Sequence, residues 1–178
     1  MRILTGIQNT NLPHLGNILG AIEPALKLSE QYDQPSLFFI ADLHTLTTLP
    51  KPIDYQHNLK ATAAAWLACG LNPKKDILYR QSHLPLVCEL AWYLHCLAPY
   101  SMLTKAHAFK DKAKHMHHIN VGLFTYPLLM AADILLYQAT HIPVGKDQLQ
   151  HIEIARDLDK RFNHHYGNIF NLPKSYLK

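Results

Sequence analysis

The sequence has few of the features that mark membrane, secreted or disulfide-stabilised proteins. It contains no run of about 18 apolar residues, so no membrane span is expected. The first residues, Met1–Gly6, lack the apolar core of a secretory signal. The only cysteines are Cys69, Cys88 and Cys96, at irregular spacings in apolar, helix-like runs. This pattern is typical of reduced core cysteines in a cytoplasmic protein, not of a disulfide framework or a zinc site.

The sequence also has no low-complexity segment and little excess charge. Charged residues make up 17% of the chain, and it contains 7 glycines and 11 prolines. This composition excludes a disordered chain, a collagen and a coiled coil. The 178 residues, 48% of them hydrophobic, are enough for one domain with a full core. The net charge of +4 suits anionic ligands such as nucleotides or RNA, but many enzymes share it, so it carries no functional conclusion.

Short strand-like runs alternate with longer helix-like patterns along the chain. Strands are expected at Ile3–Ile7, Ser36–Ala41, Asp76–Gln81 and His141–Gly145. Apolar spacings of three and four predict helices over 55–67, 87–97, 123–137 and 149–162, the third starting near Pro127. Because the connections are too long for hairpins, we expect an α/β fold, a Rossmann-like doubly wound parallel sheet with flanking helices. Ligands bind at the carboxyl ends of the strands in such folds, so the strand-to-helix junctions are the candidate sites.

The first junction, residues 6–17, has the properties of an anion site. A helix that begins there would offer free backbone N–H groups and the positive end of its dipole. Gly16 and Gly20, about one turn apart, would let a base or a phosphate approach the backbone, and His14 and Asn17 would face it as donors. No lysine of the Walker type is present, so the junction is not a P-loop. A purely structural explanation is also open: the glycines would permit close packing, and His14 would cap the helix.

A second candidate is Asp133, which lies within the nearly apolar segment 123–137. A carboxylate in such a place has a large desolvation cost unless a partner satisfies it. The partner could be internal, through an ion pair or a helix-cap contact. It could instead be a substrate N–H group.

Two further segments carry polar groups that suit a nucleotide. After the fourth expected strand, Gly145 permits close approach of backbone to ligand, and Asp147 can accept from ribose hydroxyls. Gln148 both donates and accepts, which suits an amino-acid head group. Asp147 could instead serve only the dipole of the next helix. The lysine- and histidine-rich run 105–118 is either a solvated loop or an anion contact, and no metal site is expected among its histidines, His115, His117 and His118.

Three blocks, in this order, resemble the signatures of class I aminoacyl-tRNA synthetases, and in particular the tryptophanyl branch. The blocks are Thr5–Gln8 with His14–Asn17 and Leu19–Ile22, then Phe124–Tyr137, and then Pro143–His151. Asn17 stands where the class has a second histidine, as is usual in the tryptophanyl branch. The family usually has proline and glycine where this chain has Asn9 and Asn11. The resemblance extends from Thr5 to about Pro173.

This resemblance implies an enzyme that activates L-tryptophan with ATP and transfers it to tRNA(Trp). It implies that Asp133 accepts the indole N–H, and that Mg²⁺ arrives with ATP, with no protein-only metal site. The catalytic residues it implies are His14, Asn17 and Lys112, the last within a loop that matches Phe109–Lys112. The ATP-binding residues it implies are Gln8, Asn9, Thr10, Gly16, Asn17, Gly145, Lys146 and Asp147. The tryptophan-binding residues it implies are Asp133, Tyr126, Met130, Gln148, His44, Leu4 and Gly6.

The resemblance also implies a cytoplasmic homodimer that does not contact a membrane, with residues 87–97 as a candidate interface. The second signature loop of the family, Lys-Met-Ser-Lys-Ser, and its helical anticodon-binding domain have no match in residues 1–178. We therefore expect this chain to be the N-terminal portion of the catalytic domain, with weak turnover by itself. Two other functions are open: a different nucleotidyltransferase with the same His-x-Gly-x junction, and a non-catalytic module that binds tryptophan or a nucleotide for regulation.

Overall fold

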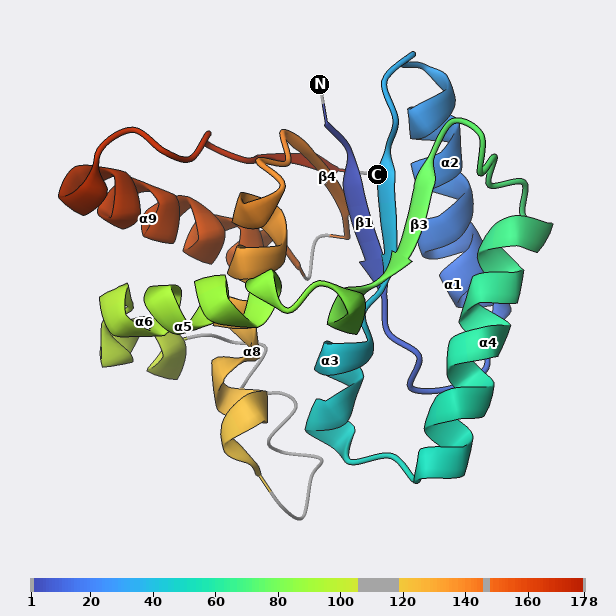
Figure 1. Ribbon diagram of the computed structural model, residues 1–178, viewed down its shortest axis with the longest axis horizontal. Helices are drawn as coiled ribbons and strands as arrows, with labels where there is room; N and C mark the ends of the chain where they lie inside the picture. Colours follow the sequence, from blue (N-terminus) through green and yellow to red (C-terminus); the bar gives the residue numbers. More distant parts are fainter. Residues whose placement is uncertain (1, 106–118, 146–147, 178) are drawn as a thin grey trace.

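The computed structural model describes residues 2–105, 119–145 and 148–177, in which strands and helices alternate (Figure 1). The strands are β1 (Leu4–Ile7), β2 (Leu37–Ile40), β3 (Ile77–Arg80), β4 (His141–Val144) and β5 (Lys174–Leu177). The helices are α1 (Leu15–Asn17), α2 (Glu23–Glu30), α3 (Asp42–Thr45), α4 (Pro52–Ala68), α5 (Leu86–Leu97), α6 (Tyr100–Thr104), α8 (Val121–Leu136) and α9 (Leu149–Tyr166). A π-helical segment, η1 (Ile18–Ile22), joins α1 to α2, and η2 (Leu46–Thr48) and η3 (Gln81–His83) are 3₁₀ turns.

The strands form the parallel arrangement expected from the sequence. β1, β2 and β3 pair in that order, and β4 pairs in parallel with β5, which the sequence did not indicate. An isolated parallel bridge between Ile3 and His141 places β4 beside β1. The resulting order, β3-β2-β1-β4-β5, changes direction between β1 and β4, as in doubly wound nucleotide-binding folds. The predicted fold class is therefore confirmed.

Pro143 explains why β1 and β4 pair at one point. The His141 N–H donates to the Arg2 carbonyl at 3.1 Å, so it lies on the β1 side of β4. Backbone groups alternate between the two sides of a strand, so position 143 also faces β1. Proline has no N–H to donate there. The ladder therefore stops after the bridge between Ile3 and His141, and the two strands can part toward their carboxyl ends.

Helices cover both faces of the sheet, with α1, α2 and α4 on one side and α5, α8 and α9 on the other (Figure 1). Successive strand residues point to opposite faces and so divide the core. Phe38 packs toward α4, where its ring stacks on Trp66 with 4.8 Å between centroids. Phe39 belongs to the cluster on the other face, together with Leu94 and Leu158. Burial on both faces explains the continuous apolar run of β2.

Helix α8 begins earlier than the sequence predicts. A start near Pro127 was expected, but the helix begins at Val121 and Pro127 lies inside it. The side chain of Asn120 caps the helix by accepting from the Leu123 N–H at 2.8 Å. Pro127 has no N–H to donate to the Leu123 carbonyl, so the helix lacks one backbone hydrogen bond there. Although α8 is strongly apolar, no helix in the described part of the chain is long and apolar enough to cross a membrane.

The prediction of core cysteines is wrong for Cys88 and Cys96, which are exposed, whereas Cys69 is partly buried. Helical spacing decides this outcome. The stripe of α5 that faces the core consists of Val87, Leu90, Ala91 and Leu94. Cys88 and Cys96 fall outside this stripe, on the solvent side of the helix.

Asp42, the first residue of α3, joins the carboxyl ends of β2 and β3. Its side chain is fully buried, forms an ion pair with Arg80 at the end of β3, and accepts hydrogen bonds from Ser82 and Tyr55. Burial by itself would raise the pKa of the Asp42 carboxyl, but the hydrogen bonds from Arg80, Ser82 and Tyr55 outweigh it and hold the pKa below its usual value. The edge of the sheet where ligands bind in this fold is thereby made rigid.

We predict that Asp42→Asn lowers the free energy of unfolding by about 3 kcal/mol at neutral pH, because it breaks a buried ion pair. The pKa of Asp42 is lower in the folded state than the ordinary value of 3.8. Its contribution is therefore present above that value and is lost as the pH falls through the folded pKa. Urea denaturation near neutral pH and near pH 3 should show the difference between the two proteins shrinking in acid. The exposed Asp157→Asn serves as the control, and a difference that grows in acid would contradict the assignment.

Candidate active site

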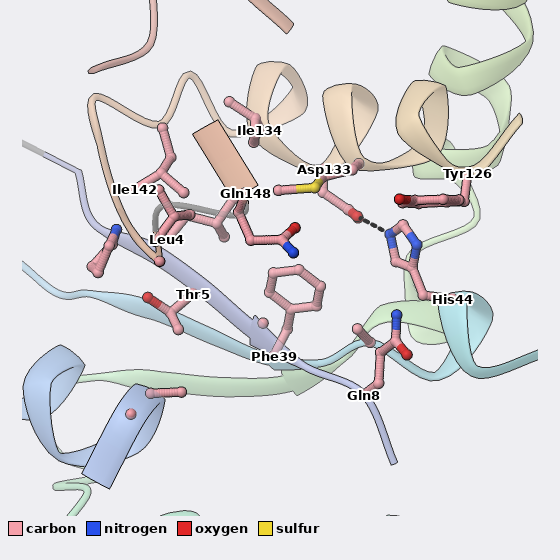
Figure 2. A pocket seen from close by; sticks show the side chains of 18 residues that line it. Leu4, Thr5, Gln8, Phe39, His44, Tyr126, Asp133, Ile134, Ile142 and Gln148 are labelled. Carbon is pink, nitrogen blue, oxygen red and sulfur yellow. Dashed lines mark hydrogen bonds and ion pairs between the residues drawn. The ribbon is translucent and has the colours of Figure 1, made fainter. Parts of the chain in front are cut away.

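A cavity of about 310 Å³ lies at the carboxyl ends of β1 and β4, where the two strands part. Side chains from β1, β2, α3 and α8 converge on it (Figure 2). This is the switch point at which ligands bind in doubly wound folds. The cavity brings together nine of the residues expected at the site, namely Leu4, Gly6, Gln8, His44, Tyr126, Met130, Asp133, Gly145 and Gln148.

Asp133 is 2% exposed and lines this cavity from α8. Its carboxylate accepts from Gln81 Nε2 at 2.8 and 2.9 Å, and His44 Nε2 lies 2.9 Å from Oδ2 (Figure 2). The internal partner left open by the sequence is therefore present, and because Asp133 also lines a cavity, its role as acceptor for a substrate N–H stays a prediction. A carboxylate has about four lone-pair positions, so these contacts leave room for a further donor from a ligand.

Tyr126 continues the polar wall of the cavity beside His44. Its hydroxyl lies 2.9 Å from His151 Nε2, and its ring meets the His44 ring edge-on, with 6.3 Å between centroids. Burial raises the pKa of Tyr126 to about 12. The hydroxyl therefore stays protonated at neutral pH and can act as a hydrogen-bond donor.

Two further residues line the cavity: Thr5, which the sequence did not single out for its side chain, and Gly20, expected from the sequence to let a ligand approach the backbone. Thr5 lines the cavity, is 6% exposed, and its hydroxyl has no hydrogen-bond partner among the described residues. Such an unmade bond costs about 1–3 kcal/mol, so this hydroxyl is suited to a ligand. Gly20 also lines the cavity, and a Cβ there would meet nothing within 4 Å. It lies in the π-helical η1, a distortion that often occurs at functional sites.

The residues at the start of α1 lie outside the cavity lining. His14 precedes α1, and its backbone N–H donates to Asn17 Oδ1 at 3.1 Å, which is the capping arrangement. A Cβ at Gly16 would come within 2.9 Å of the His14 ring, so the glycine lets that ring lie against the helix start. α1 continues through η1 to Gly20, which places this helix start next to the cavity wall. The catalytic and phosphate-binding roles of these residues stay predictions.

Asn9 and Thr10, expected to contact ATP, are held by the fold. Asn9 is fully buried: its N–H donates to Thr45 Oγ1 at 3.1 Å, its Oδ1 accepts from the Thr45 hydroxyl at 2.8 Å, and its Nδ2 donates to the Tyr55 carbonyl at 3.1 Å. Asn58 Nδ2 donates to the Thr10 carbonyl at 3.1 Å. In this structure the Asn9 side chain fixes the loop after β1 and does not line the cavity.

The remaining predicted site residues, Lys112, Lys146 and Asp147, lie outside the described residues. So do His115, His117 and His118. Within residues 2–105, 119–145 and 148–177, no group of three or more His, Cys, Asp and Glu side chains could hold a metal ion.

The fold matches that of solved synthetases. The tryptophanyl-tRNA synthetase from Campylobacter jejuni, complexed with ADP and tryptophan, superposes with a TM-score of 0.94 at 40% identity, over 100% of this chain and 55% of that chain. The enzyme from Mycoplasma pneumoniae superposes with a TM-score of 0.91 at 36% identity, over 98% of this chain and 52% of that chain. Strand order, switch-point cavity and these likenesses define the catalytic domain of a class I aminoacyl-tRNA synthetase.

Sequence comparison then fixes the family. The family model described as tRNA synthetases class I (W and Y) matches residues 1–177, and the chain belongs to this family. It is 47% identical over 185 aligned residues to the tryptophan–tRNA ligase of Xanthomonas axonopodis pv. citri, which covers 99% of this chain and 43% of that protein. The resemblance to the tryptophanyl branch is thus confirmed, and the chain spans about half the length, or less, of the relatives it matches.

Gly6 provides a direct test of how the cavity is built. A Cβ at Gly6 would lie 2.3–2.6 Å from ring atoms of Phe39, which lines the cavity. We predict that Gly6→Ala forces this ring to move, lowers the free energy of unfolding by about 1–3 kcal/mol and reduces ligand affinity. Gly20→Ala, which meets open space, is the matched control and should keep or slightly raise stability. Equal losses of stability in the two variants, measured by urea denaturation, would contradict this account.

Proposed function

We propose that residues 1–178 are the N-terminal part of the catalytic domain of an enzyme that activates L-tryptophan with ATP and transfers it to tRNA(Trp). The observation that carries the proposal is Asp133, a buried carboxylate in a cavity wall with room for one more donor. The tryptophan–tRNA ligases among the relatives, and the likeness to a synthetase complexed with ADP and tryptophan, support it. We place the second signature loop and the anticodon-binding domain beyond residue 178, so the complete reaction belongs to the whole protein.

Recognition of tryptophan is proposed to rest on one polar contact within apolar walls. Met130, Ile134 and Phe39 line the cavity and would hold the indole ring. Asp133 would accept the indole N–H, which phenylalanine lacks. An acceptor left without its donor in a dry cavity opposes binding of the wrong ligand, so discrimination against phenylalanine is strong. Tyr126 and Gln148 are the proposed contacts of the amino-acid head group.

Activation requires positioning and charge stabilisation, with no covalent intermediate on the protein. A carboxylate oxygen of tryptophan attacks the α-phosphorus of ATP, a new O–P bond forms, and the bond to the bridging oxygen breaks as pyrophosphate leaves. The backbone N–H groups at the start of α1, with His14 and Asn17, are proposed to bind phosphate oxygens, and Lys112 and Lys146 to add charge. Mg²⁺ would enter on the phosphate oxygens of ATP, which are the hard ligands it prefers.

A homodimer is proposed through the exposed surface of α5, within the interface region expected from the sequence. Trp92 on this helix is 67% exposed and Leu49 is 76% exposed. Both line a second hollow of about 360 Å³, together with Leu46, His95 and Leu129. Contiguous exposed apolar groups of this kind mark interaction surfaces, and a second copy of the chain is the proposed occupant. We also propose a cytoplasmic location, because aminoacylated tRNA is used in the cytoplasm.

The first test of the proposed function is a thermal-shift screen of the twenty amino acids with and without ATP. L-tryptophan should raise the melting temperature, because a ligand at 100 times its Kd adds about 2.7 kcal/mol of stability. Phenylalanine and tyrosine should leave it unchanged. A response to ATP without one to tryptophan would favour another nucleotidyltransferase. Tryptophan binding without pyrophosphate exchange in the whole protein would favour a regulatory module.

The second test is Asp133→Ala in the full-length enzyme. Losing a buried hydrogen bond to a charged acceptor costs about 1.5–3 kcal/mol, so the KM for tryptophan should rise roughly 10–100-fold. The preference for tryptophan over phenylalanine in pyrophosphate exchange should also fall. Asp157→Ala, an exposed substitution on α9, is the control and should leave both quantities unchanged. Unaltered tryptophan kinetics in Asp133→Ala would exclude Asp133 from ring recognition.

A further inference from the structure

Gln81, which the sequence did not indicate as a site residue, lies against the carboxylate proposed to recognise the ligand. It follows β3 as the first residue of η3, and it is 1% exposed. It is not among the residues that line the cavity, so it does not itself contact a ligand there. Any effect of Gln81 on recognition must therefore pass through a neighbour.

The orientation of the Gln81 amide is fixed by its surroundings. Its Oε1 accepts from the Leu43 backbone N–H at 3.1 Å, at the start of α3. Because a backbone N–H can only donate, the amide oxygen must face Leu43 and the amide NH₂ must face the other way. The NH₂ then donates to both oxygens of Asp133, at 2.8 and 2.9 Å. The amide thus links α3 to α8, and only this orientation of its oxygen and nitrogen satisfies both contacts.

This arrangement has two consequences for Asp133. A neutral amide donates to the buried carboxylate without supplying an opposite charge, so the carboxylate remains a strong hydrogen-bond acceptor. The bond to both oxygens also fixes the plane of the carboxylate, while His44 Nε2 engages Oδ2 from a second side. The direction left for a further donor is therefore set by Gln81 and His44 together.

We propose that Gln81 is a positioning residue that aims Asp133 at the ring N–H of the amino-acid ligand, and so contributes to the choice of tryptophan. The inference rests on the proposed function and deepens it, because it assigns part of the specificity to a side chain outside the cavity. A merely structural role would weaken all ligands of the cavity alike. A positioning role weakens only a ligand whose ring carries a donor.

The test compares two ligands that differ at the ring heteroatom. L-tryptophan carries a ring N–H, and β-(3-benzothienyl)-L-alanine has a sulfur atom in its place. Gln81→Met keeps the length of the side chain and removes both of its hydrogen-bonding groups. We expect tryptophan affinity, measured by isothermal titration calorimetry, to fall about tenfold, a loss of about 1.4 kcal/mol. Affinity for the sulfur analogue should change less than about twofold.

Two further variants complete the experiment. Gln81→Glu keeps an acceptor for the Leu43 N–H but puts a second carboxyl group against Asp133, and the proton that the two must share takes up acceptor capacity of Asp133. It should therefore show the same selective loss even if Gln81→Met is too unstable to measure. Gln56→Met makes the same chemical change at an exposed position of α4 and should alter neither affinity. Equal losses for both ligands would overturn the proposal, as would a wild-type protein that binds them equally. A wild-type protein that binds neither ligand would refute the proposed function instead.

Discussion

The lack of an N–H group at Pro143 is the constraint from which the site follows. β4 is joined to β1 by the Ile3–His141 bridge, and the next donor on that side of β4 is missing. On β1, the hydrogen bonds from Leu37 to Ile3 and from Ala41 to Ile7 show which residues face β2. The intervening backbone groups of Leu4 and Gly6 therefore face the gap. Strands β1 and β4 would otherwise pair along their length, but they part there. The opening exposes backbone and side chains to a ligand.

An opening of this kind is useful only if the polar groups around it stay in place. The structure achieves this with satisfied buried pairs at the same edge of the sheet. Asp42 ties β2 to β3 through Arg80, Asn9 ties the loop after β1 to Thr45 of α3, and Gln81 ties η3 to α8. Each of these groups would be costly to bury alone, and each has its partner, so the network resists distortion. The hydroxyl of Thr5 is the contrast, because it has no partner among the described residues and belongs to a residue that lines the cavity.

Much of this could be predicted from the sequence, for a physical reason. Strands buried on both faces have continuous apolar runs, and helices have a regular apolar spacing, so the four expected strands and the main helices were placed within a few residues. Candidate residues of β1, of α8 and of the segment after β4 meet in one cavity because the carboxyl ends of parallel strands meet at one edge. Cys88 shows the limit of apolar content as a guide, since the phase of a helix decides burial. Gln81 and Asn9 show a second limit, because a hydrogen bond between residues far apart in the chain leaves no local pattern.

Under the proposed function, ligand recognition and folding depend on the same side chains at this site. Asp133 could not be buried without Gln81 and His44, and it could not select a ring donor if those two neutralised or turned it. A lysine in place of Gln81 would satisfy burial but would compete with the ligand for the carboxylate. An apolar residue would leave the carboxylate short of donors. A neutral amide locked by the Leu43 N–H meets both requirements, so in the proposed function the polarity of this buried glutamine is part of what makes the cavity selective.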